Sequence, residues 1–197
     1  MKEANININQ IKSIIMATNP NIKISTCLWF DNQAEEAAKY YTSIFPDSKI
    51  GRISRYGKEG YEIHKKPAGS VLTVEFWLQG NEYLGLNGGA QFRFNEAISL
   101  TVQCDTQEEI DRYWEKLSEG GDKNAQECGW LKDKYGLSWQ IVPRELAIMM
   151  SNPDTEKTSR LMNVLLKMKK LDIAALKQAF DNKTAGSQTK KVHAEVH

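Results

Sequence analysis

Short apolar runs that alternate with polar residues dominate the chain up to residue 143, and helical spacing takes over after it. A two-residue period predicts strands, whereas apolar residues three or four apart predict helices. The expected strands are 22–30, 49–56, 71–78, 82–86, 98–104, 130–131 and 137–142. Two helices with one apolar stripe each are expected before Pro46 and before Gly120.

One segment of the chain is repeated. Residues 24–35 and 98–109 are identical at five of their aligned positions: Ile24/Ile98, Ser25/Ser99, Asp31/Asp105, Gln33/Gln107 and Glu35/Glu109. Each copy predicts a strand that runs into a helix, with Asn32 and Glu35, or Thr106 and Glu109, spaced as a capping box. The repeat therefore predicts one domain, 22–143, of two similar half-units, 22–89 and 97–143, whose strands face each other across a shared cleft.

The remaining segments are additions to this domain. Residues 1–21 are expected to be a loosely attached leader or an edge element, because they end at a turn signal. The segment 57–69 is rich in glycine and predicts a mobile loop. Residues 144–181 predict a helical extension, and the polar residues 182–197 are expected to be disordered.

Composition limits the possible partners. The 26 basic and 25 acidic residues give a net charge of +1, so no global field favours nucleic acid. No apolar run approaches the roughly 18 residues of a membrane span, and no signal peptide is recognisable, so a cytoplasmic protein is expected. The cysteines Cys27, Cys104 and Cys128 have no metal-site spacing and are expected to be structural thiols.

Several segments together resemble the PhnB-like branch of the glyoxalase/bleomycin-resistance/dioxygenase superfamily. They are LWFDNQAEEA at 28–37, Tyr41, FPDS at 45–48, LNGG at 86–89, GWLKDKYGLSWQIVP at 129–143 and MKKLDIAAL at 168–176. The resemblance covers about residues 22–180 and implies an α+β fold of paired βαβββ modules, an eight-stranded cleft and a homodimer. Some members of this branch carry the label demethylubiquinone 3-methyltransferase. The chain has no glycine-rich strand-to-helix turn that could cradle a nucleotide-like cofactor, so no cofactor is expected.

Enzymatic relatives, as the resemblance implies, hold a divalent metal with histidines and carboxylates on the cleft floor. The matching positions here hold Ser99, Gln140, one of the residues 25–29 and one of the residues 84–87, none of which is histidine or carboxylate. The histidines are His64, His193 and His197, outside the predicted strands. Hydroxyls and amides bind transition metals weakly, so no metal is expected.

Strand alternation predicts which side chains face the cleft. Thr101 shares a face with Ser99, whereas Val102 and Cys104 pack under the helix. Glu75 is either a buried acid or base in the cleft or an outward residue on a wet face. Strand tryptophans are either core or stack on a ligand. The expected ligand-binding residues are Cys27, Trp29, Glu75, Trp77, Asn87, Ser99, Thr101 and Gln140.

The resulting functional hypothesis is a metal-independent protein that binds a small, partly apolar molecule in the cleft. The alternative is an enzyme, either a metal-dependent lyase, isomerase or dioxygenase, or the methyltransferase of the family label. A third possibility is an oligomeric interaction module that takes no small ligand.

Overall fold

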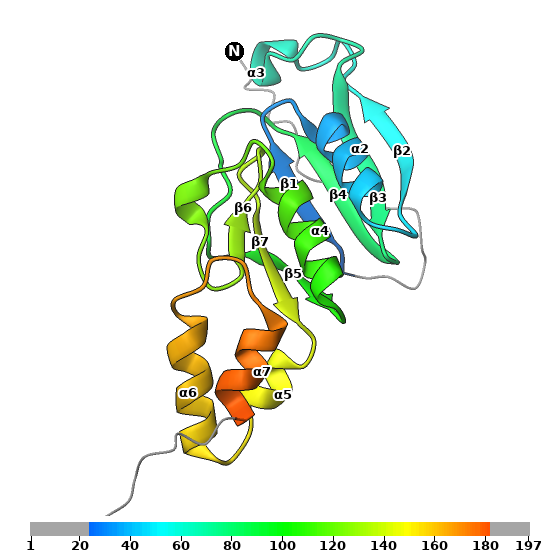
Figure 1. Cartoon of the computed structure of the whole chain (residues 1–197). Helices are drawn as coiled ribbons and strands as arrows, with labels where there is room; N and C mark the ends of the chain where they lie inside the picture. The colour runs from blue at the N-terminus through cyan, green and yellow to red at the C-terminus, as the bar shows by residue number, and fades with distance from the viewer. Residues whose placement is uncertain (1–23, 182–197) are drawn as a thin grey trace, which may run out of the picture. The chain divides into compact units, whose positions relative to one another are not determined.

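The computed structural model describes residues 24–181, which form two compact units, 24–95 and 96–181 (Figure 1). The predicted leader 1–21 and tail 182–197 lie outside these residues. Each unit is described by itself.

The first unit is a four-stranded sheet with the order β1-β4-β3-β2. Its strands are β1 (Thr26–Phe30), β2 (Lys49–Arg55), β3 (Val71–Leu78) and β4 (Asn81–Asn87). β1 runs parallel to β4, and the other pairs are antiparallel. Helix α2 (Ala34–Ile44) connects β1 to β2 and packs on one face of the sheet, so the predicted βαβββ module is confirmed.

The core of the first unit lies under α2. Val74 and Phe76 of β3 are fully buried, as is Tyr41 of the helix, whose ring lies 6.2 Å from that of Phe76. A side chain on Gly85 would come within 3.1 Å of Ala34, so small residues at both positions let the helix approach β4 closely. The opposite face of the sheet carries no helix of this unit.

Helix α2 begins differently from the prediction. The capping box at Asn32 is wrong, because the N-cap residue is Gln33 and its side chain makes no capping bond. Instead Ala34 N donates to Asn87 Oδ1 at 2.9 Å, and Asn87 Nδ2 donates to Val71 O at 3.1 Å. The side chain of Asn87, 53 positions away in the sequence, therefore accepts the hydrogen bond of the first backbone N–H of α2. The same side chain links the start of the helix to β4 and β3.

The segment 57–69 contains one helical turn, α3 (Tyr61–His64). Two backbone bonds close its base: Tyr56 N donates to Ser70 O at 2.9 Å, and Gly69 N donates to Tyr56 O at 2.8 Å. Lys66 Nζ also donates to Asp31 O at 2.7 Å. The predicted loop is therefore attached to the end of β1.

The second unit has a three-stranded sheet with the order β5-β7-β6. Its elements are β5 (Ser99–Cys104), helix α4 (Gln107–Ser118), the short helix η1 (Lys123–Ala125), β6 (Trp130–Lys132) and β7 (Ser138–Pro143). The predicted cap of α4 is confirmed, since Glu109 N donates to Thr106 Oγ1 at 3.2 Å.

Residues 24–181 form seven strands, four and three in the two sheets, as the residue pattern predicts, where the family resemblance implied eight. The place of the eighth is taken by η1 and by an isolated bridge between Glu127 and Trp130. Cys128 and Gly129 have φ angles of 49° and 86°, which lie outside the extended region and interrupt a strand there.

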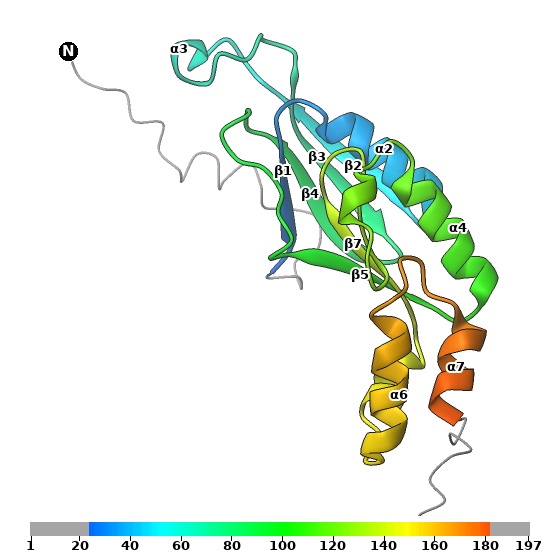
Figure 2. The same cartoon turned by 60° about the vertical axis from the view of Figure 1, so that its left-hand side comes forward.

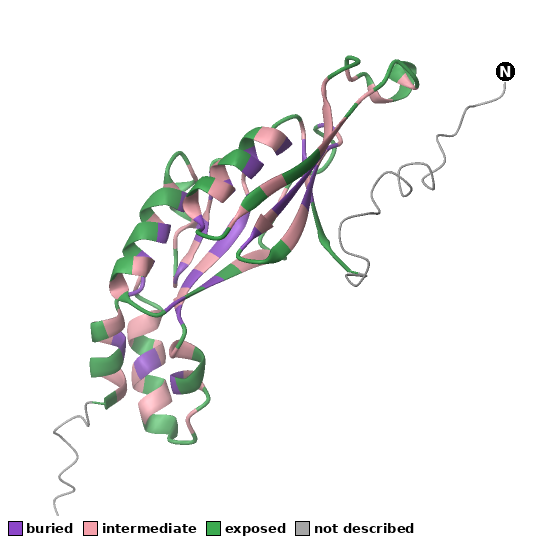
Figure 3. Ribbon diagram, turned by 90° about the vertical axis from the view of Figure 1, so that its right-hand side faces the viewer, coloured by how far each residue is buried: buried purple, intermediate pink, exposed green. Residues whose placement is uncertain are grey.

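Three helices complete the second unit (Figure 1): α5 (Leu146–Met150), α6 (Thr155–Leu165) and α7 (Ile173–Asp181), of which the last two are labelled in Figure 2. They enclose a cluster of buried residues: Met149, Leu161, Leu171 and Leu176. Cys128 N and Gly129 N donate to the carbonyls of Met168 and Lys169 at 2.7 and 2.8 Å, which ties the extension to the segment before β6. In Figure 3 the buried positions of the helices lie on their inner sides and the exposed ones outside.

No helix among residues 24–181 combines the length and the apolar character needed to cross a bilayer.

Replacing Asn87 with alanine should lower the free energy of unfolding by about 2 kcal/mol, because Ala34 N and Val71 O both lose their partner. Urea denaturation followed by circular dichroism measures this loss. The control is Asn81→Ala, which removes a single long bond of 3.4 Å and should cost less than about 0.5 kcal/mol. Equal losses in both variants would show that Asn87 does not hold the helix.

Candidate functional site

The helix-free face of the first sheet presents aligned rows of side chains. Register places Cys27 beside Leu84 and Leu84 beside Glu75, so these three share one face. Their strand neighbours Leu28, Val74 and Phe76 are buried on the other face. Cys27 and Glu75, two of the predicted ligand-binding residues, therefore lie on the same face of the sheet.

Glu75 lies near the centre of this face and is only 4% exposed. Its Oε1 accepts bonds from Arg52 Nε at 3.1 Å and Nη2 at 2.5 Å, whereas Oε2 is buried and has no partner within the described chain. The alternative of a solvated outward residue is wrong for Glu75. A buried carboxylate oxygen without a partner is costly, so this oxygen can accept a bond from a bound group.

The two tryptophans of this face differ in their surroundings. Trp29 donates its indole N–H to Gly89 O at 2.8 Å and packs edge-on against Phe92, with ring centres 4.9 Å apart. Trp77 lies under the ammonium of Lys49, at 4.9 Å from its ring centre, and remains half-buried. Trp29 therefore holds the segment after β4, and Trp77 has a ring surface that is still partly accessible.

Cys27 is exposed, and Cys104 is buried under α4. Desolvation raises the pKa of Cys27 and, with the negative charges of Glu109 and Asp105, raises that of Cys104 to about 12. Both thiols therefore stay protonated at neutral pH, which disfavours a thiolate nucleophile or a thiolate metal ligand.

The helix-free face of the second sheet has two rows. Register aligns Ser99 with Ser138 and Lys132 in the first row. The second row consists of Thr101, Gln140 and Trp130. Gln140 Nε2 donates to Ser99 Oγ at 2.8 Å, so these two predicted site residues are in contact. Val102 and Cys104 are buried on the opposite face, which confirms the predicted alternation.

A hollow of about 380 Å³ lies beside these rows, lined by residues of the η1 segment, β6 and β7. Ser138 belongs to its lining and is 1% exposed, and its hydroxyl has no partner within the described chain. Lys132 also lines it and forms an ion pair with Glu96. The hollow thus combines an aromatic wall at Trp130 with hydrogen-bonding and charged groups.

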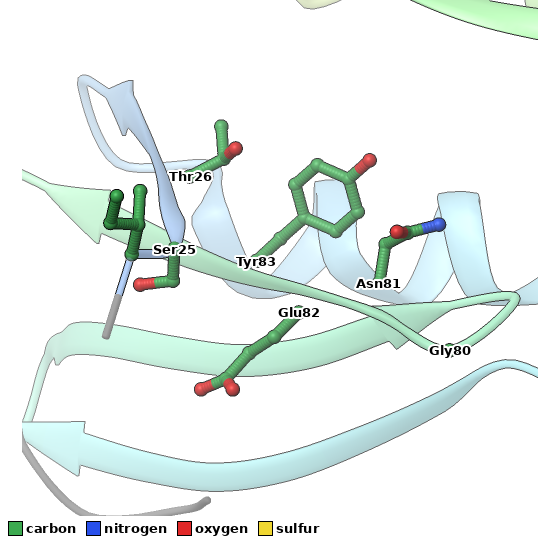
Figure 4. Close-up of a pocket in the computed structure, with 7 residues that line it drawn as sticks. Ser25, Thr26, Gly80, Asn81, Glu82 and Tyr83 are labelled. Carbon is green, nitrogen blue, oxygen red and sulfur yellow. The ribbon is translucent and has the colours of Figure 1, made fainter. Parts of the chain in front are cut away.

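A smaller hollow of about 270 Å³ lies at the start of β1 and the β3–β4 hairpin. In Figure 4 the side chains of Thr26 and Tyr83 rise on the same side of their strands, whereas Glu82 points to the other side. Burial raises the pKa of Tyr83, which keeps its hydroxyl protonated. None of the predicted ligand-binding residues lines this hollow.

Comparison with known proteins gives the family. The sequence profile of the 3-demethylubiquinone-9 3-methyltransferase family matches residues 22–142. The chain belongs to this family. The resemblance to its PhnB-like members, inferred from the sequence motifs, is therefore confirmed.

The chain is also similar to solved structures, of which a PhnB protein agrees with this assignment. A PhnB protein from Bacillus cereus, described with the same methyltransferase name, is 39% identical; the match covers 61% of this chain and 99% of that one, with a TM-score of 0.53. A Staphylococcus aureus protein is 30% identical over 63% of this chain and 97% of its own, with a TM-score of 0.27. A glyoxylase/bleomycin resistance protein/dioxygenase domain from Frankia sp. is 16% identical over 64% and 94%, with a TM-score of 0.40. No curated protein matches the chain.

Asn87 stands apart from the other predicted ligand-binding residues of this family member. It is 4% exposed, and both atoms of its amide bond backbone groups of α2 and β3. Its side chain therefore serves the fold, and the prediction that it supplies a hydrogen bond to a ligand loses its basis.

The donors on the sheets do not fit the metal site that the superfamily resemblance implies. Within residues 24–181, no three histidine, cysteine, aspartate or glutamate side chains gather around one point. Ser99 and Gln140, which occupy two of the implied positions, bond each other through a neutral hydroxyl and a neutral amide. Neither group is a good ligand for a transition metal.

Three residues of these faces were missing from the predicted set: Arg52, Trp130 and Lys132. The alternation Trp130-Leu131-Lys132, with Leu131 buried, carried a usable signal for the second sheet. Arg52 pairs with Glu75 across two strands whose register shifts near residues 50–53, so spacing along the sequence could not find it.

The pairing of Glu75 can be tested with a double-mutant cycle. Arg52→Met should lower the free energy of unfolding by about 1–3 kcal/mol, because it leaves a carboxylate buried without a partner. Adding Glu75→Leu should restore most of the loss. Urea denaturation of the four proteins measures the coupling.

The matched control is Lys39→Met, which breaks the exposed pair with Glu35 and should change stability by less than about 0.5 kcal/mol. If the double variant is less stable than Arg52→Met alone, the account of Glu75 is wrong.

Proposed function

We propose that this family member binds a small, partly apolar molecule on the helix-free faces of its sheets, without the divalent metal of enzymatic relatives. The observation that carries the proposal is the second sheet, where the bonded pair Ser99 and Gln140 lies beside a hollow of about 380 Å³ with Trp130 in its wall. A hollow of this size can hold a small molecule, and Trp130 and Leu131 supply the apolar part of its lining.

The first sheet supports the same proposal. Trp77 offers a partly accessible ring, Cys27 an exposed neutral thiol, and Glu75 an unpaired carboxylate oxygen. A partly apolar ligand with a hydrogen-bond donor suits such a face. A homodimer, which the resemblance implies, and a cytoplasmic location are parts of the proposal.

The second candidate function is the methyltransferase of the family name, which the match over residues 22–142 favours. A methyltransferase needs a site for its methyl donor, and the chain lacks a glycine-rich strand-to-helix turn of the kind that cradles a nucleotide-like cofactor. Calorimetry with S-adenosylmethionine separates the two functions, since a heat of binding would favour the methyltransferase.

The neutral fluorophore N-phenyl-1-naphthylamine should bind saturably, and Trp130→Ala should weaken its binding about five- to tenfold through loss of an aromatic wall. Fluorescence titration measures both. The control is Tyr61→Ala, which removes an exposed aromatic ring on α3 and should leave the affinity unchanged. Absence of saturable binding would contradict the proposal.

The metal content gives a separate test. Tag-free protein purified without chelator should contain far less than one divalent ion per chain by mass spectrometry, and EDTA should not change the affinity for the fluorophore. A stoichiometric ion whose removal alters binding would favour a metal-dependent enzyme.

A further inference from the structure

The hollow of the second unit lies where the expected eighth strand is missing. Its wall contains the segment from η1 to β6, including Cys128. This segment is held by the backbone bonds of Cys128 and Gly129 to Met168 and Lys169, at 2.7 and 2.8 Å. The residues that hold it belong to the helical extension after residue 142, so the wall of the hollow depends on that extension.

Ser138 has an unusual position in this wall. It is 1% exposed and lines the hollow, yet its hydroxyl has no hydrogen-bond partner within residues 24–181. Its row neighbour Ser99 already accepts a bond from Gln140. A buried hydroxyl without a partner destabilises the protein, so a bound polar atom at this place would be stabilising.

Lys132 lies next to Ser138 on the neighbouring strand and also lines the hollow. Its side chain is 23% exposed, whereas that of its partner Glu96 is 62% exposed. An ion pair with so exposed a carboxylate contributes little to stability. A carboxylate inside the hollow can therefore replace Glu96 as the partner of Lys132 at small cost.

We propose that the hollow binds a small aromatic monocarboxylate, with its carboxylate between Lys132 and Ser138 and its apolar body against Trp130. The inference rests on the proposed function and names the chemical class of the ligand. Glu127 and Glu96 also line the hollow, so one lysine faces two exposed carboxylates. The net charge of this lining repels a phosphate ester of higher charge more strongly than it repels a monoanion, which Lys132 can still pair with directly.

The test compares 2-naphthoate with 2-naphthamide, which has nearly the same shape but no charge, by calorimetry at pH 7 and low salt. The native protein should bind the naphthoate about tenfold more tightly. Lys132→Met should abolish this preference, and Lys132→Arg should keep it, because only the former removes the charge.

Ser138→Ala separates binding from folding. The variant should weaken naphthoate binding about fivefold and leave the free energy of unfolding unchanged or higher, because it removes an unpaired buried hydroxyl. A structural role for Ser138 would instead lower the stability. The control is Lys177→Met, which breaks a comparable ion pair with Glu145 in the helical extension and should not affect binding.

The carboxylate inference is wrong if 2-naphthoate and 2-naphthamide bind with equal affinity, or if Lys132→Met and Lys177→Met change binding equally. In either case, binding of the naphthamide would still support the proposed function. If neither probe binds, this inference fails, and the neutral fluorophore decides the proposed function separately.

Discussion

Each sheet of this protein packs against its helix on one face only, and the other features depend on this constraint. Because side chains alternate along a strand, Val74 and Phe76 pack under α2. In the second sheet, Val102 and Ile141 lie on the face opposite the helix-free face. The residues between them in the strands must then point the other way. Hydrogen-bonding, charged and aromatic side chains therefore gather on surfaces that no helix of the same unit covers.

Buried polar groups divide into two kinds by their partners. Asn87 bonds the start of α2 and the backbone of β3, and Asp133 accepts bonds from Tyr135 N, Leu137 N and the indole of Trp139. These groups are satisfied, and their role is to hold the fold. Glu75 Oε2 and Ser138 Oγ are unpaired within the described chain and lie on the open faces, which is why they enter the functional argument.

Family membership sets the fold and leaves the chemistry open. The match over residues 22–142 places the chain in a family named for a methyltransferase. At the positions where the resemblance implies metal ligands, however, the helix-free faces hold neutral groups: the hydroxyl of Ser99, the amide of Gln140 and the thiol of Cys27. Function belongs to the site and not to the fold. The helical extension after residue 142 also shapes the candidate site, because its backbone carbonyls hold the wall of the hollow near Cys128.

The sequence by itself determined what depends on local order. The two-residue period assigned Ser99 and Thr101 to one face, and the spacing of Thr106 and Glu109 located the start of α4. Only the tertiary structure decided that Asn87 caps α2, that Arg52 reaches Glu75, and that η1 forms in the segment before β6. The two-residue period and the helix caps depend on residues a few positions apart, so the sequence shows them directly. The other contacts join distant parts of the chain and depend on strand register and on local backbone angles, such as the φ angle of Cys128.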